Sequence, residues 1–408
     1  MQNTQQSGIS RELTWLLSVA CAVAVGNLYW IQPLLTEIAE EFNISSAAAG
    51  NLVTATQVGY ASGVLLLVPL GDSLNRKRLV PMVMIGASIA LFLSAMASNY
   101  VFLLACLASV GFLTISGQLM VPLAGSLASD EQRGKILGTL SSGILSGILL
   151  SRAISGLLAD IFGWRAIYFI ASFVSLILAI IVARNLPPET SNVNVRYIQL
   201  LSSVIKVVQR YRSIQITLLI SFCIFVVFSL FWTSLTFLLS AAPFSYSVTE
   251  IGMVGLLGFA GALAARNAGK LHDKGASVSG TGYALLAVFI AIIISGFGAQ
   301  SIVLLIITVL LLDMGIQTLN VLNQTRILAL EPQSRSRINT AFIVVNFVGA
   351  AAGSAMAGIL WQHGGWLFVV VGEVMFILFA MTCWVLGRDS LNSAALNNVA
   401  SSKPVLTE

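Results

Sequence analysis

Long apolar runs separated by short polar segments cover the chain from residue 13 to residue 386. Runs of about 20 apolar residues are long enough to cross a bilayer as helices, and lipid leaves no backbone group unpaired. A window of that length predicts an all-α membrane protein with twelve transmembrane helices, at residues 13–33, 47–70, 79–97, 100–126, 136–159, 165–184, 214–241, 249–271, 277–298, 301–327, 338–362 and 366–386.

Composition agrees with this multi-pass pattern. Hydrophobic residues make up 57% of the chain and charged residues only 9%, against about 25% charged in soluble domains. That is too little polar surface for a water-soluble globule, so a soluble enzyme and a nucleic-acid-binding protein are excluded and the expected surroundings are lipid. The sequence contains no phosphate-binding loop and no Cys/His cluster with metal-ligand spacing, so we expect no cofactor and no metal.

Charge placement predicts the orientation of the spans. With the N-terminus in the cytoplasm, all basic residues except Arg152 and Arg165 fall in cytoplasmic segments or at cytoplasmic helix ends. An excess of Lys and Arg on one side is the positive-inside pattern. We therefore expect both termini in the cytoplasm, Arg165 outside, and Arg152 within the membrane.

The longest polar connection divides the predicted spans into six and six. We expect an N-terminal six-helix bundle (1–184), a cytoplasmic central loop (185–213), and a C-terminal six-helix bundle with a short cytoplasmic tail (214–408). Within the loop, the stretch YIQLLSSVIKVVQRY is amphipathic and basic. It either lies on the inner leaflet or is a plain tether between the halves.

Several residues of the first half recur in the second at an almost constant offset. Leu28-Tyr29-Trp30 recurs 202 positions later as Leu230-Phe231-Trp232. At the same offset Phe42, Ser45 and Gly50 recur as Phe244, Ser247 and Gly252, and Asp72 matches Asp273 at an offset of 201. These correspondences predict two parallel six-helix repeats, an arrangement whose substrate site lies at the midplane between the repeats.

The loop after the second span of each half pairs an aspartate with basic residues: Asp72, Arg76 and Lys77 in PLGDSLNRKRL, and Asp273 and Lys274 after Gly269 in GKLHDKG. At these positions the loops resemble the loop signature of the major facilitator superfamily. Val68, Ser73 and Asn75 depart from the signature. The resemblance implies a loop that braces the two halves during the conformational change; the alternative is a positive-inside cluster with an incidental acid.

Three longer segments resemble one group of that superfamily, the twelve-span bacterial proton-linked exporters of drugs and metabolites. They are GNLYWIQPLL, ISGLLADIFGWRAIYF, and LLDMGIQTLNVLNQTRILALEPQSRSRIN. The resemblance covers nearly the whole chain and implies the major facilitator fold and a monomer in the bacterial inner membrane. Two features depart from the group: Leu107 replaces an arginine common in the fourth span, and the glycine-proline and glycine pair of the antiporter signature are replaced by Ser151-Arg152 and Ser155-Gly156.

Polar residues within the spans predict a substrate cavity. Asp313, Gln317, Asn320 and Gln324 share one face of the tenth span, and a polar face has no reason to face lipid. The resemblance implies that the first, fourth, seventh and tenth spans line the cavity, with Asn27, Tyr29, Trp30, Gln32, Thr114, Gln118, Phe231 and Trp232 as further lining residues. The alternative is that these polar groups only bond neighbouring helices.

Three ionisable residues lie well inside the predicted spans: Arg152, Asp313 and Glu373. At 1.5 Å per residue, Arg152 lies about 12 Å and Asp313 about 18 Å from the outer edge. We hypothesise that these two face each other across the two halves when the cavity is closed on the outside, and that protonation of Asp313 weakens the pair. The alternatives are that Arg152 reaches out to water or Asp160, or that it binds an anionic substrate. Glu373 is expected to stay protonated or to reach toward water.

These features predict a secondary transporter that works by alternating access and exports small organic molecules, such as a drug, sugar or nucleoside, in exchange for protons. Its partners would be the substrate, protons and lipid, with no nucleic acid. The first alternative is uptake or facilitated diffusion of a small metabolite. A membrane-embedded enzyme is disfavoured because the spans hold no catalytic constellation, and a channel because the halves are duplicated and joined by a long loop.

Overall fold

The computed structural model describes residues 9–187, 197–261, 263–264, 268, 276–331 and 334–401, and these residues form helices, turns and coil without any strand. Within this part of the chain, eight helices are long and apolar enough to cross a membrane, judged by length and composition. The predicted all-helical membrane architecture is therefore confirmed.

The chain forms two compact units. Unit 1 contains the residues up to Ile44, Asn51–Leu200 and Tyr246–Leu256, and unit 2 contains Ser45–Gly50, Leu201–Ser245 and the residues from Leu257 onward. The helices mainly in unit 1 are α1 (Arg11–Gly26), η1 (Gln32–Leu34), α2 (Leu35–Glu41), α3 (Ser46–Leu67), α4 (Leu70–Ser73), α5 (Arg76–Ala95), α6 (Tyr100–Leu113), α7 (Ser116–Leu127), α8 (Asp130–Phe162), α9 (Arg165–Asn185) and α12 (Val248–Val254).

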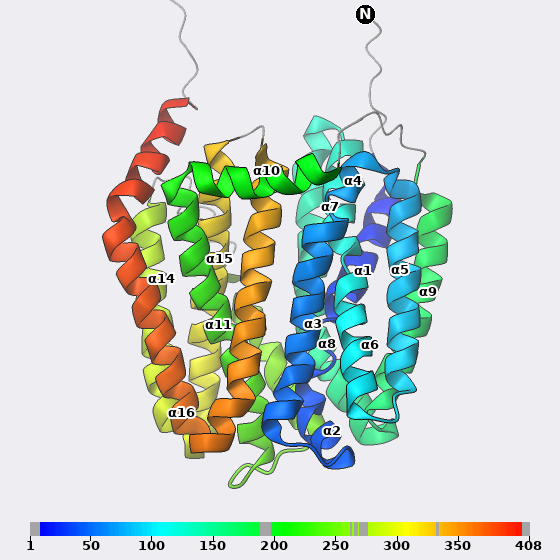
Figure 1. Cartoon of the computed structure of the whole chain (residues 1–408), viewed down its shortest axis with the longest axis vertical. Coiled ribbons are helices and arrows are strands. Elements are labelled where there is room, and N and C mark those ends of the chain that lie inside the picture. The colour runs from blue at the N-terminus through cyan, green and yellow to red at the C-terminus, as the bar shows by residue number, and fades with distance from the viewer. Residues whose placement is uncertain are drawn as a thin grey trace, which may run out of the picture. The chain divides into compact units, whose positions relative to one another are not determined.

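Unit 2 is built from long helices that run side by side, as Figure 1 shows for α11, α14, α15 and α16. The last of them, α16, folds back on itself at Gly364 and Gly365, which have non-helical backbone angles. Its two limbs correspond to the last two predicted spans. The helices mainly in this unit are α10 (Tyr197–Arg210), α11 (Arg212–Ser240), α14 (Ser277–Phe297), η3 (Gly298–Gln300), α15 (Ile302–Leu330) and α16 (Arg335–Ser401), and the short η2 (Gly255–Gly258) lies at the boundary of the two units.

Two predicted spans of unit 1 are not continuous helices. The span predicted at 13–33 ends as α-helix at Gly26 and continues through turns into η1, where Pro33 cannot donate a backbone hydrogen bond. The span predicted at 100–126 breaks between α6 and α7, at Thr114. The Ser155 hydroxyl donates to the Trp30 carbonyl at 2.7 Å, so protein groups replace part of the lost helical bonding.

Local features recur at the offset of 202 that the sequence shows, and residues 202 positions apart are called counterparts below. The side chains of Ser45 and Ser247 each accept a hydrogen bond from the backbone N–H three residues later. The same cap forms at Asn99 and at Ser301. Each unit also has a glycine with positive φ directly before a tryptophan. Gly163 stands before Trp164, which precedes α9, and Gly365 stands before Trp366, which begins the second limb of α16.

Glycines set the closest helix contacts, and these contacts also repeat. In unit 1, α8 and α12 pack so tightly that Gly156 leaves no room for a side chain beside the Val248 carbonyl. In unit 2, the counterpart Gly358 packs in the same way on the Ser46 carbonyl. Small residues allow backbones in a membrane bundle to approach this closely. The same close contact between a glycine and a backbone carbonyl is therefore present within each unit.

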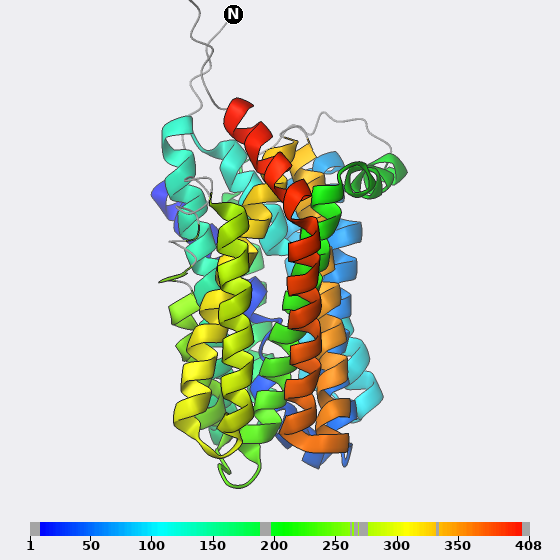
Figure 2. The ribbon, with the colours of Figure 1, turned by 90° about the vertical axis from the view of Figure 1, so that its left-hand side faces the viewer.

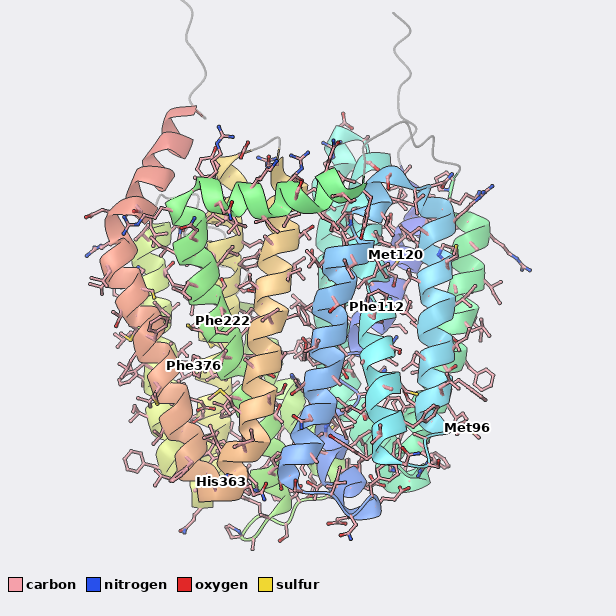
Figure 3. The ribbon with its side chains drawn as sticks, in the orientation of Figure 1. Met96, Phe112, Met120, Phe222, His363 and Phe376 are labelled. Atoms are coloured by element: carbon pink, nitrogen blue, oxygen red, sulfur yellow. The ribbon has the colours of Figure 1, made fainter. Side chains whose placement is uncertain are left out.

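The amphipathic stretch of the central loop forms α10, which runs across the upper part of the long helices of unit 2 in Figure 1 and is seen end-on beside them in Figure 2. Val204 and Val207 are buried in a hydrophobic cluster with residues of α11, α15 and α16. Ile198 and Ile205, seven residues apart, are 77% and 60% exposed. His363, labelled in Figure 3, lies at the turn of α16, at the opposite end of this unit from α10.

An ion pair at the predicted outer end of unit 1 gives a pH-dependent prediction. Arg165 Nη1 donates to Glu41 Oε2 at 2.8 Å, the Trp164 indole donates to the same oxygen at 2.6 Å, and the guanidinium hydrogen bond lowers the pKa of Glu41. We expect Glu41→Gln to lower the thermal midpoint slightly at pH 7, because a partly exposed pair contributes at most about 1 kcal/mol. The carboxylate stabilises the fold above its ordinary pKa of 4.5 and loses this effect as pH falls through its lowered pKa.

Thermal unfolding of the purified protein at a series of pH values measures this difference. Glu40→Gln is the matched control, since it removes the same charge from the same helix without breaking this pair. A Glu41→Gln deficit that is unchanged at acidic pH would contradict the role assigned to the carboxylate.

Candidate substrate and coupling residues

Asn27 is the centre of a buried hydrogen-bond cluster at the break after α1. Its side-chain nitrogen donates to the Thr114 hydroxyl at 3.3 Å and to the Ser175 hydroxyl at 3.5 Å. Its side-chain oxygen accepts the Trp30 indole N–H at 2.8 Å. The predicted residues Asn27, Trp30 and Thr114 are thus brought together, and Ser175 of α9 is a member that the sequence pattern did not indicate.

A small hollow lies beside this cluster, lined by residues of α1, α5, α7 and α9 together with Asn27 and Thr114. Its free space is about that of a single water molecule, and water commonly satisfies buried polar groups. The hollow in this conformation is therefore too small for an organic substrate. In this conformation the amide of Asn27 holds the broken ends of α1 and α6 together.

Arg152 forms a second cluster within unit 1. Only 3% of the residue is exposed, and its Nε donates to Gln32 Oε1 at 2.6 Å. Its guanidinium carbon lies 5.2 Å from the centre of the Tyr29 ring, a cation–π contact. A side chain on Gly255 would come within 2.9 Å of Arg152 Cδ, so this glycine leaves the room that the arginine occupies. The structure brings Arg152, Gln32 and Tyr29 together.

Asp160, one of the partners considered for Arg152, accepts the backbone N–H of Thr249 at 2.9 Å. The bond ties the end of α8 to α12 within unit 1. Gln118 of α7 donates to the Tyr60 hydroxyl at 3.0 Å, which links α7 to α3. Tyr60 is 1% exposed and is another residue that the sequence analysis did not select, because a tyrosine in an apolar run gives no polar periodicity.

Asp313 lies in the middle of α15 and is 5% exposed. The Trp232 indole of α11 donates to its Oδ1 at 3.3 Å, so two predicted residues of unit 2 meet. Phe231, the neighbour of Trp232, is fully buried and packs edge-on against Trp366 with ring centres 5.8 Å apart. In this structure Phe231 is a packing residue of unit 2.

The counterpart of Asp313 explains how a carboxylate fits at this helix crossing. Its counterpart is Gly111, which packs directly on the backbone of α3 and leaves no room for a side chain. On the α3 side of this crossing Gly59 packs just as closely on the backbone of α6, and its counterpart in unit 2 is Gly261. A side chain at Gly261 would lie 2.9 Å from the Asp313 carbonyl oxygen and 3.0 Å from Gln317 Cγ. Unit 2 thus replaces one contact glycine of the crossing by an acid.

The remaining members of the polar face of α15 contact the first limb of α16. The side-chain nitrogen of Gln324 donates to Asn339 Oδ1 at 2.8 Å. Asn320 Oδ1 accepts from Asn346 at 3.5 Å, a long and weak bond. In this structure the two amides bond to another helix, which is the alternative to substrate binding that the sequence left open.

The sequence analysis counted Arg326 among the charges at cytoplasmic helix ends, but the structure shows that its side chain lies inside the protein. The residue is fully buried in unit 2, where its Nη2 donates to the Thr281 hydroxyl at 2.6 Å and to both oxygens of Ser277 at 3.1 Å. Its counterpart is the buried Ala124. An arginine at the end of a span is ordinary by sequence, so only the packing of α14 on α15 shows that it lies inside the protein.

The loop signature is only partly within the described residues. Arg76 Nε donates to the Gly71 carbonyl at 2.8 Å, and the Asn75 side chain caps α5 by accepting the backbone N–H of Lys77 at 2.9 Å. The side chain of Asp72 lies outside the described part, as do Gly269, Asp273 and Lys274. In the part of the chain that was searched, no group of three His, Cys, Asp or Glu residues has the arrangement of a metal site.

Comparisons with known proteins agree with this architecture. The sequence profile of the Major Facilitator Superfamily matches residues 17–330. A protein of Escherichia coli O157:H7 named "Uncharacterized transporter YgaY" is 39% identical over 92% of this chain and 95% of its own length. A "Probable sugar efflux transporter" of Helicobacter pylori strain G27 is 24% identical over 81% of this chain and 84% of its own length.

Among solved structures, the crystal structure of the nucleoside transporter NupG superposes with a TM-score of 0.72 and covers 96% of this chain and 100% of its own. The two sequences are only 14% identical, so this likeness concerns the fold alone. The profile match spans most of the chain, and the relative from Escherichia coli O157:H7 covers nearly all of it. The chain belongs to the Major Facilitator Superfamily and is a multi-pass membrane transporter.

Proposed function

We propose that this transporter works by alternating access between its two halves and exports a small organic molecule across the bacterial inner membrane in exchange for protons. The observation that carries the proposal is Asp313, a carboxyl placed deep in α15 beside the indole of Trp232. An ionisable group at such depth is expensive and generally functional. The efflux activity in the name of the Helicobacter pylori relative supports the export direction.

The counterparts of the buried ionisable residues support a functional reason for them. Arg152 and Asp313 have Ser354 and Gly111 as counterparts, both uncharged. The same helix crossings therefore form without a charge in the other half of the chain. A charge that packing does not need is best explained by binding or coupling.

For the coupling step we retain the pairing of Arg152 with Asp313 as a proposal. When the transporter is closed on the outside, the two charges attract each other; a proton on Asp313 weakens the attraction and favours opening. A ligand or proton shifts such an equilibrium only by its different affinity for the two states. Within unit 1, Gln32 and Tyr29 contact the guanidinium and hold it in place.

A double-mutant comparison tests the pairing. We expect Arg152→Ala and Asp313→Asn each to slow transport, and the double variant to be little worse than either alone, because residues that act as a pair are not additive. Initial transport rates in proteoliposomes measure this. Losses that multiply in the double variant would show that the two residues act independently.

The substrate-facing surface is proposed to include Asn27, Tyr29, Trp30, Gln32, Thr114 and Gln118 from unit 1, and Trp232, Gln317, Asn320 and Gln324 from unit 2. Aromatic faces beside amides suit organic molecules of mixed polarity. Phe231, which the sequence also placed in this set, packs against Trp366 in this structure.

Proton movement in proteoliposomes is the experiment that tests the function. The purified protein is reconstituted with a pH-sensitive dye inside, and sugars, nucleosides and drugs are added outside one at a time. A substrate that is transported and moves protons in the opposite direction supports exchange. A substrate that is transported without any proton movement overturns proton coupling and leaves facilitated diffusion as the function.

A further inference from the structure

Glu373 is a buried acid that the proposed mechanism does not use. It lies in the second limb of α16, is 0% exposed, and neither of its carboxyl oxygens has a hydrogen-bond partner among the described residues. A carboxylate taken out of water without a partner is far less stable than the neutral acid in the same place. The neutral, protonated acid is therefore the form that these surroundings favour.

The surroundings of Glu373 are apolar protein. Val369, Ile377 and Ala380 share its helix face and are fully buried, whereas Phe368, Val371, Met375, Leu378 and Phe379 of the same limb are exposed on the other faces. A side chain on the adjacent Gly372 would lie 3.4 Å from Leu230 of α11. The carboxyl thus belongs to the face that packs inside unit 2 rather than to the face exposed toward lipid.

No charged group on the helices packed against this limb explains the acid. The ionisable residues of α11 are Arg212 and Cys223, and α14 has only Tyr283, which is 75% exposed. In α15, Asp313 is bound by Trp232 and Arg326 by Ser277 and Thr281. In the same limb of α16, Cys383, Arg388 and Asp389 are ten or more positions from Glu373, about 15 Å or more along a helix. His363 lies beyond Gly364 and Gly365, at the turn between the two limbs.

Polar atoms without partners occur on the facing helix as well. The hydroxyls of Ser229, Thr233 and Ser234 in α11 are buried and have no hydrogen-bond partner among the described residues. Ser229 is next to Leu230, which contacts the position beside Glu373. Hydroxyls both donate and accept hydrogen bonds, so these three groups have unused hydrogen-bonding capacity in α11.

The fold itself does not require a carboxyl at this position. The counterpart of Glu373 is Ala171 in α9, which is 3% exposed and fills the equivalent place with a methyl group. Burial of an alanine or leucine side chain at this position would cost less free energy than burial of an unpaired acid. Acids in membrane segments without a structural reason are functional candidates.

We propose that Glu373 is a proton-binding site of this transporter: it holds a proton while α11, α14 and the second limb of α16 pack as they do here, and releases it to water when these helices part. In the release step the O–H bond of the carboxyl breaks, the proton passes to a water molecule, and the hydrated carboxylate remains. Repacking of the helices requires the proton to return. Use of this proton in transport rests on the proposed function, but its binding and release do not.

Infrared spectroscopy of the full chain in phosphatidylethanolamine/phosphatidylglycerol liposomes tests the proposal without a substrate. The carbonyl stretch of a protonated carboxyl is separate from that of a carboxylate and shifts when the proton is replaced by deuterium. At neutral pH we expect Glu373→Gln and Glu373→Ala to lose one such band completely, and Asp313→Asn to retain it. In deuterated buffer the band of the parent protein should shift as the helices open and close.

Three results would overturn the proposal. A spectrum of Glu373→Gln with the protonated-carboxyl band unchanged would show that Glu373 is ionised. A band that never shifts in deuterated buffer, while the amide groups of the loops exchange, would show a sealed structural acid. Failure of Glu373→Gln to fold would also count against the proposal, since glutamine closely matches a neutral glutamic acid in size.

The proteoliposome experiment separates this proposal from the proposed function. If the parent protein transports a substrate without moving protons, proton-coupled export fails, and an exchanging Glu373 band still supports the proton site. If Asp313→Asn stops proton movement while Glu373 shows no exchange, coupling at Asp313 holds and the second site fails.

Discussion

Asp313→Asn is expected to bind substrate and to move no protons. Asparagine keeps the size of the side chain and can still accept the Trp232 indole N–H, which donates to Asp313 at 3.3 Å, but it cannot gain or lose a proton. The loss of proton movement should be complete, because no partial charge on an amide replaces a titrating group. Dye fluorescence in proteoliposomes and substrate binding to purified protein measure the two properties separately.

Asp389→Asn is the control for this change, since it alters the same residue type at an exposed position near the end of α16. It should leave proton movement at the level of the parent protein. If Asp313→Asn retains proton movement per molecule of substrate, Asp313 is not the coupling acid, and the carboxyl of Glu373 becomes the next candidate.

Gly156→Leu is expected to damage the packing of α8 on α12. The Cβ of any side chain at Gly156 would overlap the carbonyl of Val248, and a backbone carbonyl cannot rotate away as a side chain can. Overpacking of this kind costs about 1–3 kcal/mol. The thermal midpoint of the purified protein should therefore fall by several degrees, and the yield of folded protein should fall with it.

Gly138→Leu is the matched control, because Gly138 lies in the same helix and a side chain there meets nothing within 4 Å. Both changes replace a helical glycine by leucine, so their difference isolates the helix contact from helix propensity. Equal midpoints for the two variants would show that α8 and α12 separate at little cost, against the close contact seen here.

The secondary structure was largely predictable from the apolar runs. A run of this length can satisfy its backbone in lipid only as a helix, which is why α5, α8, α9, α11 and α15 lie close to predicted spans. The breaks after Gly26 and at Thr114 were not predicted, because hydropathy averages over about 20 residues and is insensitive to a few turn residues. Pro33 was the one local signal of the first break.

For the candidate site, the sequence predicted which polar residues share a helix face but not which partners they bond. The polar periodicity of Asp313, Gln317, Asn320 and Gln324 follows from the geometry of one helix, so sequence alone shows that they share a face. Which partner each one bonds depends on neighbouring helices: Asn339 for Gln324, and Trp232 for Asp313.

The sequence by itself determined that this protein is a helical membrane protein, because length and apolarity are properties of the linear chain. The residues that recur at an offset of 202 predicted that its two halves are repeats. Only the tertiary structure decided which charges are inside. Arg326 and Arg165 are both basic residues at the ends of apolar runs, yet the first is fully buried between α14 and α15 while the second pairs with Glu41 at the surface. Burial is a property of packed neighbours, and those neighbours are far away in the sequence.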